Sequence, residues 1–182
     1  LTPRMIKIWA KILKSVRGSQ LRLKAKALGD QMTRTRIVQA FAKQGIEEER
    51  LKLMAWVTDS SPLAAYQGVD IGLDTYPYHG TTTTMEALWM GVPVVTLAGN
   101  WHASRVGISI LARANMDDLI ATTPSNYVKI AASLANSPDT LEGFRQRLRG
   151  SVVAGGLTNG ARFTKELEKA YRWAWQDWGT NE

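Results

Sequence analysis

The 182-residue sequence contains no cysteine and only two histidines, His79 and His102. Without cysteine it has no disulfide bonds, thiolate metal sites or cysteine nucleophile. Two histidines are too few for a metal centre built on imidazole ligands, so we expect no metal. No apolar run approaches the ~18 residues that a membrane-spanning helix needs, and no signal-peptide pattern opens the sequence. We therefore expect a cytoplasmic protein that does not enter a membrane.

The composition is that of an ordinary globular domain, with 45% hydrophobic and 21% charged residues. The net charge of +7 is uneven, because eight of the 23 basic residues lie in the first 26 positions and no acid precedes Asp30. Such an end could meet nucleic acid, an anionic ligand or a partner domain, but a charged run is most often a solvated surface. No helix-turn-helix, zinc or RNP pattern accompanies it, so we expect no nucleic-acid partner.

Short strands alternate with helices along the chain. At the start, Thr2 and Pro3 form a helix cap, and apolar residues then recur at helical spacing as far as Val16. Strands are expected near residues 21–23, 51–56, 69–73 and 94–97, and a short element of undecided type at 117–120. Helices are expected at 3–17, 30–44, 63–66, 85–90, 103–114, 127–134, 138–148 and 161–178. This alternation predicts an α/β fold with a largely parallel sheet.

The central stretch, residues 70–97, forms a strand–loop–helix–strand unit. Its loop contains Gly80, and four threonines lead into the following helix. A helix start offers unpaired backbone N–H groups and the positive end of the helix dipole, which suits a phosphate. A threonine-rich helix cap without any ligand is the alternative explanation.

Residues 69–99 read VDIGLDTYPYHGTTTTMEALWMGVPVVTLAG, and residues 102–107 read HASRVG. These two segments closely resemble the C-terminal lobe of the O-GlcNAc transferase family, especially its bacterial, SPINDLY-like members. The resemblance implies a Rossmann-like three-layer αβα sandwich with a largely parallel sheet, the C-terminal half of a two-lobed GT-B glycosyltransferase. Residues 1–182 would then form a single nucleotide-sugar-binding lobe that ends in a long helix at about 161–178.

The resemblance also implies an activity. Members of this family are inverting transferases that move a sugar, typically GlcNAc, from a UDP-sugar to Ser or Thr hydroxyls of proteins. The implied partners are a UDP-sugar, a protein acceptor, and the upstream lobe and TPR repeats of a longer chain; no cofactor is expected. Because the active site would lie between two lobes, we expect these 182 residues alone to have little or no transferase activity.

Five consecutive residues are implied as ligands of the UDP diphosphate. Gly80, Thr81, Thr82 and Thr83 match the loop and helix start that receive it through backbone N–H groups and hydroxyls. Gly80 permits close approach of the backbone, and small hydroxyl donors reach phosphate oxygens without clashing. His79 either hydrogen-bonds a phosphate or only shapes the turn.

The nucleoside has its own implied contacts. Glu86 matches an acidic residue that accepts hydrogen bonds from the ribose hydroxyls, because a carboxylate offers acceptors to two adjacent donors. A first-turn glutamate that only complements the helix dipole is the alternative. The backbone around Val57 and Thr58 corresponds to the segment that contacts the uracil edge. No residue stands out as the catalytic base.

The sequence departs from the family pattern in two places. Active relatives usually carry a histidine at or beside the position of Pro62, and proline has no side-chain donor to replace it. The family's diphosphate-binding lysine would lie before Leu1, and Lys24 and Lys26 are the basic residues that could reach the cleft instead. These departures keep a second interpretation open, a degenerate, non-catalytic nucleotide-sugar-binding or scaffold module.

Aromatic residues and one arginine are expected to have structural roles. A tryptophan stripe at helical spacing is more often core or interlobe packing than a site, and this applies to Trp89, Trp173, Trp175 and Trp178. Arg105 is expected to bond carbonyl groups or an acid rather than to act in catalysis.

Overall fold

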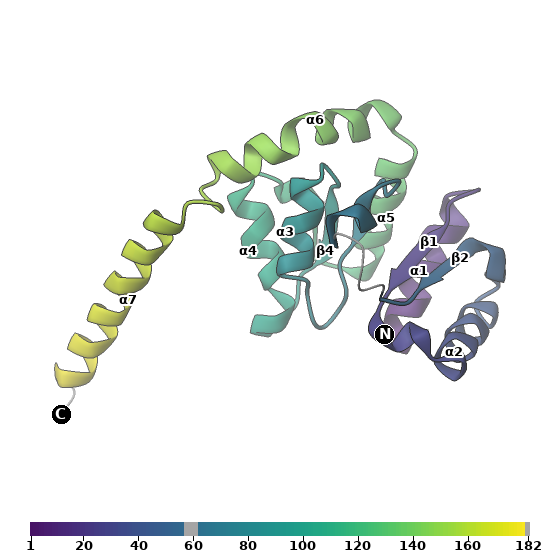
Figure 1. The fold of residues 1–182 in the computed structure, drawn as a ribbon, viewed down its shortest axis with the longest axis horizontal. Helices are drawn as coiled ribbons and strands as arrows, with labels where there is room; N and C mark the ends of the chain where they lie inside the picture. Colours follow the sequence, from purple (N-terminus) through teal and green to yellow (C-terminus); the bar gives the residue numbers. More distant parts are fainter. Residues whose placement is uncertain (57–61, 181–182) are drawn as a thin grey trace.

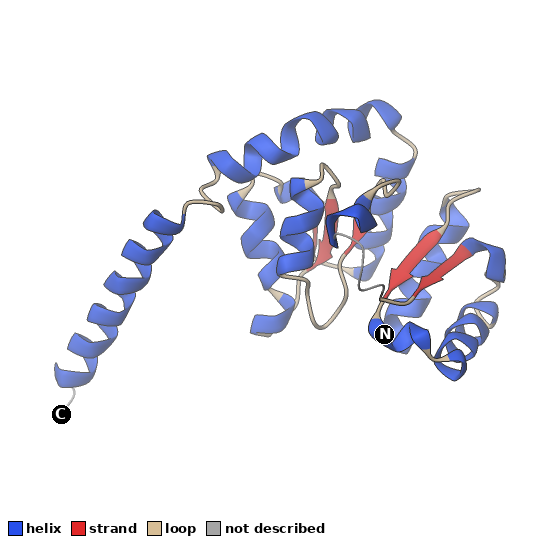
Figure 2. Ribbon diagram, in the orientation of Figure 1, coloured by secondary structure: helices blue, strands red, loops and turns tan. Residues whose placement is uncertain are grey.

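The computed structural model describes residues 1–56 and 62–180. Parallel strands alternate with helices along the chain, as the sequence predicts (Figures 1 and 2). In the described part, the strands are β1 (Leu21–Lys24), β2 (Leu51–Met54), β3 (Gly72–Leu73), β4 (Val94–Leu97) and β5 (Ile120–Ala121). The α-helices are α1 (Pro3–Ser15), α2 (Gln31–Ala42), α3 (Thr82–Trp89), α4 (Val106–Arg113), α5 (Pro124–Ala135), α6 (Pro138–Ala154) and α7 (Gly160–Thr180). Short 3-10 helices complete the set: η1 (Lys26–Gly29), η2 (Glu48–Arg50), η3 (Pro62–Tyr66), η4 (His102–Ser104) and η5 (Asp117–Leu119).

Helix α1 forms as its sequence predicts. The Thr2 hydroxyl accepts the Met5 N–H at 3.2 Å, which satisfies one of the amides left free at a helix start. Pro3 occupies the first helical position, where its missing N–H costs nothing. The apolar face of α1 is buried in the core, with Trp9 only 3% exposed. This helix contacts α2 and α5, so its burial joins the first part of the fold to the rest.

The strands pair in two groups within the described residues. Strands β1 and β2 run parallel, with Leu21 opposite Leu51, and α2 provides the crossover between them. Strands β3, β4 and β5 form the second group, with Gly72 opposite Val94 and Thr96 opposite Ile120. The prediction of a parallel α/β fold is therefore confirmed.

Two details of the second group differ from the expected element limits. The undecided segment near residue 117 begins as η5 and ends in the two-residue strand β5. The strand expected at 69–73 pairs only over Gly72–Leu73. A Cβ on Gly72 would lie 2.9 Å from Val94 Cγ2, so the glycine allows β3 to pack closely on β4. Strand β5 is too short for alternation of polar and apolar residues to reveal it.

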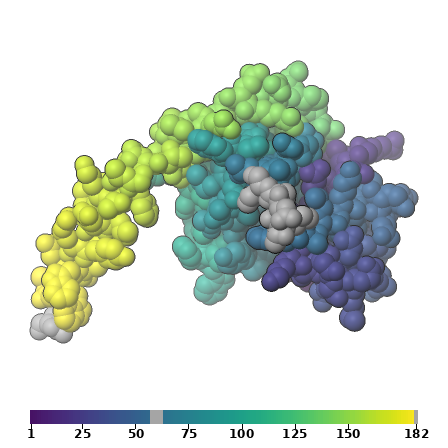
Figure 3. Space-filling model, viewed as in Figure 1, coloured from purple at the N-terminus to yellow at the C-terminus, as the bar shows by residue number. Residues whose placement is uncertain are grey.

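One hydrophobic core spans both groups of strands, and α3 and α5 both contact β4. Helix α6 packs on α3 and α5. Helix α7 instead extends away from the body of the molecule, and none of its residues is buried (Figures 1 and 3). Trp173, Trp175 and Trp178 are 54–71% exposed, so the expectation that they pack in the core is wrong, while packing against another lobe stays a prediction. Among the described residues, no helix is long and apolar enough to cross a membrane.

Candidate functional site

The loop between β3 and α3 is organised by the carboxylate of Asp74, which is 6% exposed. Asp74 Oδ1 accepts the Gly80 N–H at 2.8 Å and the Thr75 N–H at 3.0 Å. The loop between them contains a cis peptide bond at Tyr76-Pro77. Asp74 therefore fixes Gly80 directly before the start of α3.

The other oxygen of Asp74 belongs to a buried polar cluster. Asp74 Oδ2 accepts the hydroxyl of Thr96, which lies on β4, at 2.8 Å. His79 lies beside them, with Nε2 3.0 Å from the Leu97 carbonyl oxygen and Nδ1 3.1 Å from the Gly107 nitrogen. A carbonyl only accepts and a backbone N–H only donates, so Nε2 carries the proton and Nδ1 is the acceptor. His79 is thus a neutral imidazole with both nitrogens engaged.

The burial of His79 bears on the two roles considered for it. Its side chain is 1% exposed, and its own N–H donates to the Ala103 carbonyl at 2.8 Å. The side chain therefore offers no donor to a ligand, and the geometry favours the turn-shaping role over a diphosphate contact. Desolvation by burial raises the pKa of Asp74 above its ordinary value, although its hydrogen bonds from Gly80, Thr96 and Thr75 oppose the shift.

A chain of hydrogen bonds ties this loop to the helices behind it. The Trp9 indole N–H donates to the Tyr127 hydroxyl at 3.3 Å, and that hydroxyl donates to the Asp74 carbonyl at 2.9 Å. Tyr127 is fully buried, and burial raises the pKa of its phenol, which stays protonated as a donor. Helices α1 and α5 therefore hold the carboxyl end of β3 in place.

The threonines at the start of α3 divide into two kinds. Thr84 is buried and its hydroxyl donates to the Gly80 carbonyl at 3.1 Å. Thr81, Thr82 and Thr83 are exposed, and Thr81 at the N-cap makes no side-chain capping hydrogen bond. A Cβ on Gly80 would lie 2.8 Å from the Thr84 hydroxyl, so a larger residue does not fit here without rearrangement. Capping therefore does not account for the three exposed hydroxyls.

Glu86 lies one turn into α3, and a residue from another element holds its carboxylate. The Tyr66 hydroxyl, at the end of η3, lies 3.1 Å from Glu86 Oε2 and 2.9 Å from the Thr83 carbonyl oxygen. Desolvation by burial is the larger cause, and the interaction with Glu86 the smaller cause, of a raised pKa of Tyr66. Sequence reasoning missed Tyr66, because it lies 20 positions before Glu86 and so leaves no local pattern.

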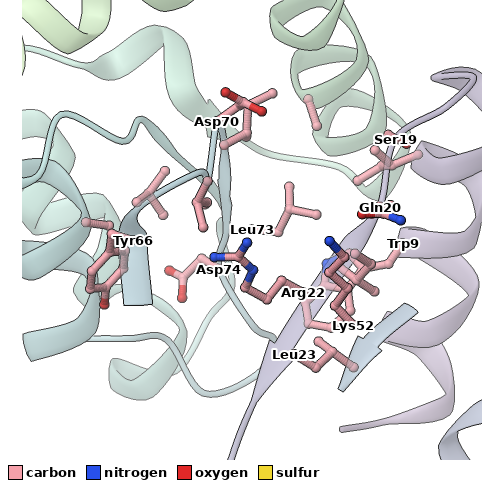
Figure 4. A pocket seen from close by; sticks show the side chains of 18 of the residues that line it. Trp9, Ser19, Gln20, Arg22, Leu23, Lys52, Tyr66, Asp70, Leu73 and Asp74 are labelled. Carbon is pink, nitrogen blue, oxygen red and sulfur yellow. The ribbon is translucent and has the colours of Figure 1, made fainter. Parts of the chain in front are cut away.

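A cleft of about 850 Å³ between β1, β3 and α3 is lined by Gly80, Thr83, Thr84 and Glu86 (Figure 4). His79, Thr81 and Thr82 are not among its lining residues. The Arg22 side chain extends from β1 into the cleft, as Figure 4 shows, and its guanidinium donates to the Ala65 and Gln67 carbonyls at 3.2 and 2.9 Å. Of the two lysines considered as substitutes for an upstream lysine, Lys24 lines the cleft, but Lys26 is not among its lining residues. The polar side chains that line the α3 side of the cleft include Tyr66, Asp74, Thr75, Thr83, Thr84 and Glu86.

The predictions for the uracil contact, for Arg105 and for metal binding are compared with the structure in turn. Val57 and Thr58 lie outside the described residues, so the uracil contact stays a prediction. Arg105 donates to the Gly99 carbonyl at 3.1 Å, which agrees with its expected structural role. No group of three or more His, Asp or Glu side chains in the described ranges could hold a metal ion.

The sequence of this chain is similar to those of known glycosyltransferases. The model of the family described as Glycosyl transferase family 41 matches residues 1–167. A rice (Oryza sativa subsp. japonica) protein named Probable UDP-N-acetylglucosamine--peptide N-acetylglucosaminyltransferase SPINDLY is 39% identical over 177 residues, covering 97% of this chain and 19% of that protein. Its Arabidopsis thaliana counterpart is 37% identical over 183 residues, covering 100% of this chain and 20% of that protein.

A solved structure agrees with these sequence matches. A mutant O-GlcNAc transferase of Thermobaculum terrenum superimposes with a TM-score of 0.91 at 40% identity, covering 97% of this chain and 34% of that one. The chain thus spans about a fifth of the length of the curated relatives and about a third of the solved structure. The match confirms the expected likeness to the C-terminal region of a GT-B transferase.

Proposed function

The chain belongs to glycosyl transferase family 41, and from this premise we propose that it is the UDP-sugar-binding lobe of a transferase that glycosylates Ser or Thr residues of proteins. GlcNAc is the proposed sugar, because the similar proteins are named for UDP-N-acetylglucosamine and peptide substrates. The observation that carries the proposal is the row of exposed threonines beside Gly80 at the start of α3, where the N-cap residue Thr81 makes no side-chain capping hydrogen bond.

The diphosphate is proposed to bind at this helix start. The first N–H groups of α3 have no acceptor within the helix, and the helix dipole adds positive potential there. Thr81, Thr82 and Thr83 add exposed hydroxyl donors. The Asp74 carboxylate supports this role, because it holds Gly80 in place before any ligand arrives.

The ribose is proposed to bind at Glu86. Its carboxylate lies one helical turn beyond the proposed diphosphate position and lines the same cleft. An ionised carboxylate accepts from both hydroxyls of a diol, and such charge-assisted hydrogen bonds are stronger than neutral ones. The uracil is proposed to meet the backbone near Val57 and Thr58.

Transfer of the sugar requires stabilisation of the leaving diphosphate, placement of the acceptor hydroxyl and removal of its proton. The α3 start is suited to the first of these tasks. The other two are proposed to need an acceptor-binding lobe, preceded by TPR repeats, in a longer protein. We therefore propose that the 182 residues alone bind the nucleotide but transfer little or no sugar.

A second candidate function is a non-catalytic module that binds a nucleotide sugar or acts as a scaffold. The observation that favours it is Pro62, which stands where active relatives usually carry histidine. Proline cannot supply the hydrogen bond that a histidine side chain would make.

Calorimetric titration of the chain with UDP tests the proposal. We expect saturable binding in the micromolar to millimolar range, and Glu86→Gln should weaken it about tenfold or more, because hydrogen bonds to a charged group are lost. Glu47→Gln is the matched control, since Glu47 is exposed before β2 and is not among the residues that line the cleft. Absence of binding at millimolar UDP would contradict the proposed nucleotide site and favour the scaffold alternative.

A further inference from the structure

The Tyr66 hydroxyl is the one hydrogen-bond donor that reaches the Glu86 carboxylate among the described residues. It contacts Oε2 only, so Oε1 keeps its acceptor sites for another partner. A phenol with a raised pKa stays protonated at neutral pH and acts as a donor. The pairing therefore fixes one oxygen of Glu86 and leaves the other available.

Tyr66 is itself held from two sides. Its single hydroxyl proton is shared between two acceptors, because the Thr83 carbonyl oxygen in the first turn of α3 lies 2.9 Å from the same hydroxyl oxygen. From β1, the Arg22 guanidinium donates to the carbonyls of Ala65 and Gln67, the residues on either side of Tyr66. These contacts fix the end of η3 against α3, so the hydroxyl lies at a defined place beside the carboxylate.

We propose that Tyr66 is a positioning residue that orients the Glu86 carboxylate toward the ribose hydroxyls of the nucleotide. A glutamate side chain has three rotatable bonds, and ordering them on binding reduces affinity. The Tyr66 hydrogen bond orders the carboxylate in advance and directs Oε1 at the ligand. This inference rests on the proposed function, because it assigns a role within the proposed nucleotide site.

The proposed role of Tyr66 predicts that its effect on affinity depends on the ribose hydroxyls of the ligand. Tyr66 acts through Glu86, so its hydroxyl matters only for a ligand whose ribose carries hydroxyl groups. UDP and 2′,3′-dideoxyuridine diphosphate differ in those hydroxyls alone. A general loss of structure around η3 would instead weaken both nucleotides to the same extent.

The test compares the affinities of the unmodified chain, Tyr66→Phe and Tyr171→Phe for these two nucleotides. Tyr66→Phe keeps the ring and removes one hydroxyl, whereas Tyr171→Phe removes the same group from the exposed helix α7. We expect Tyr66→Phe to weaken UDP binding about three- to tenfold, as the loss of one hydrogen bond does, and to leave the dideoxy nucleotide unaffected. Tyr171→Phe should change neither affinity.

A double-mutant cycle with Glu86→Ala, which removes the acceptor of the Tyr66 hydroxyl, adds a second measurement. Once Glu86 is replaced, Tyr66→Phe should cause almost no further loss of UDP affinity. Equal weakening of both nucleotides, additive losses in the cycle, or no effect of Tyr66→Phe on UDP would each overturn the positioning role while the unmodified chain still binds UDP. If the unmodified chain does not bind UDP, the proposed function itself fails, and this inference fails with it.

Discussion

Replacement of Thr96 by valine tests the buried cluster that holds the proposed diphosphate loop. Thr96 is fully buried on β4, and its hydroxyl donates to Asp74 Oδ2 at 2.8 Å. The other polar group near that oxygen is His79 Nδ1, at 3.5 Å, which is an acceptor in the tautomer assigned above. Valine has nearly the same shape as threonine, so Thr96→Val removes the donor and leaves the packing almost unchanged.

The expected cost follows from the state of Asp74. A hydrogen bond to a charged group contributes about 1.5–3 kcal/mol net, and an ionised Asp74 in Thr96→Val has an oxygen without a donor. Thr96→Ser keeps the hydroxyl and loses one buried methyl group, which costs about 1 kcal/mol. We therefore expect the valine variant to be the less stable of the two, although valine is the more hydrophobic residue.

Denaturant unfolding of the three proteins measures these differences, provided that the m-values agree. Apolar burial and strand preference alone would give the opposite order, with valine at least as stable as the unmodified chain. If Thr96→Val proves as stable as the unmodified chain, or more stable than Thr96→Ser, the hydrogen bond to Asp74 is not what stabilises this cluster.

The same variant gives a pH dependence of defined sign. Burial raises the pKa of Asp74 above 3.8, so the folded chain binds this proton more tightly than the unfolded chain does. The stability that protonated Asp74 contributes is fully present below pH 3.8 and is lost as the pH rises through the pKa of Asp74 in the folded chain. The cost of Thr96→Val applies to ionised Asp74, so it should shrink as the pH falls through that pKa. Unfolding at about pH 7 and about pH 4 measures the change.

Two further predictions concern helix ends and surfaces. The Thr33 N–H donates to Asp30 Oδ2 at 2.7 Å at the start of α2, and hydrogen bonds from the Thr33 side chain and from this N–H lower the pKa of Asp30. Its stabilising effect should be present above 3.8 and be lost as the pH falls through the folded pKa, and an NMR titration midpoint of Asp30 at or above 3.8 would contradict this. Trp175 and Trp178 are 71% and 54% exposed, with ring centroids 5.3 Å apart. We expect them to promote self-association of the isolated chain, which changing both to glutamine should reduce in sedimentation velocity; a chain that is monomeric at every concentration would refute this.

Local sequence patterns predict most of the elements. The Thr2 cap and the apolar spacing of α1 involve residues three or four positions apart, and the structure confirms both. The break at Gly80 and the start of α3 are predicted for the same reason. The two-residue strand β5 is too short for such a pattern, because its residues become a strand only by pairing with β4.

The candidate site is predictable only in part. The row from Gly80 to Thr83 is contiguous and can be recognised from the sequence. The role of His79 depends on partners at Leu97 and Gly107, and that of Glu86 on a partner at Tyr66. These contacts are made across the sheet or between neighbouring helices, so no local spacing indicates them.

The sequence by itself determines the order of strands and helices, the parallel α/β class and the glycine–threonine helix start, since each depends on short-range backbone preferences and hydrophobic spacing. The tertiary structure decides which polar groups are already paired and which remain free for a ligand. It buries His79, pairs Glu86 with Tyr66 and leaves the aromatic stripe of α7 exposed. The physical reason is that burial and hydrogen-bond pairing depend on which distant segments pack together, whereas the pattern within a segment depends only on its neighbours.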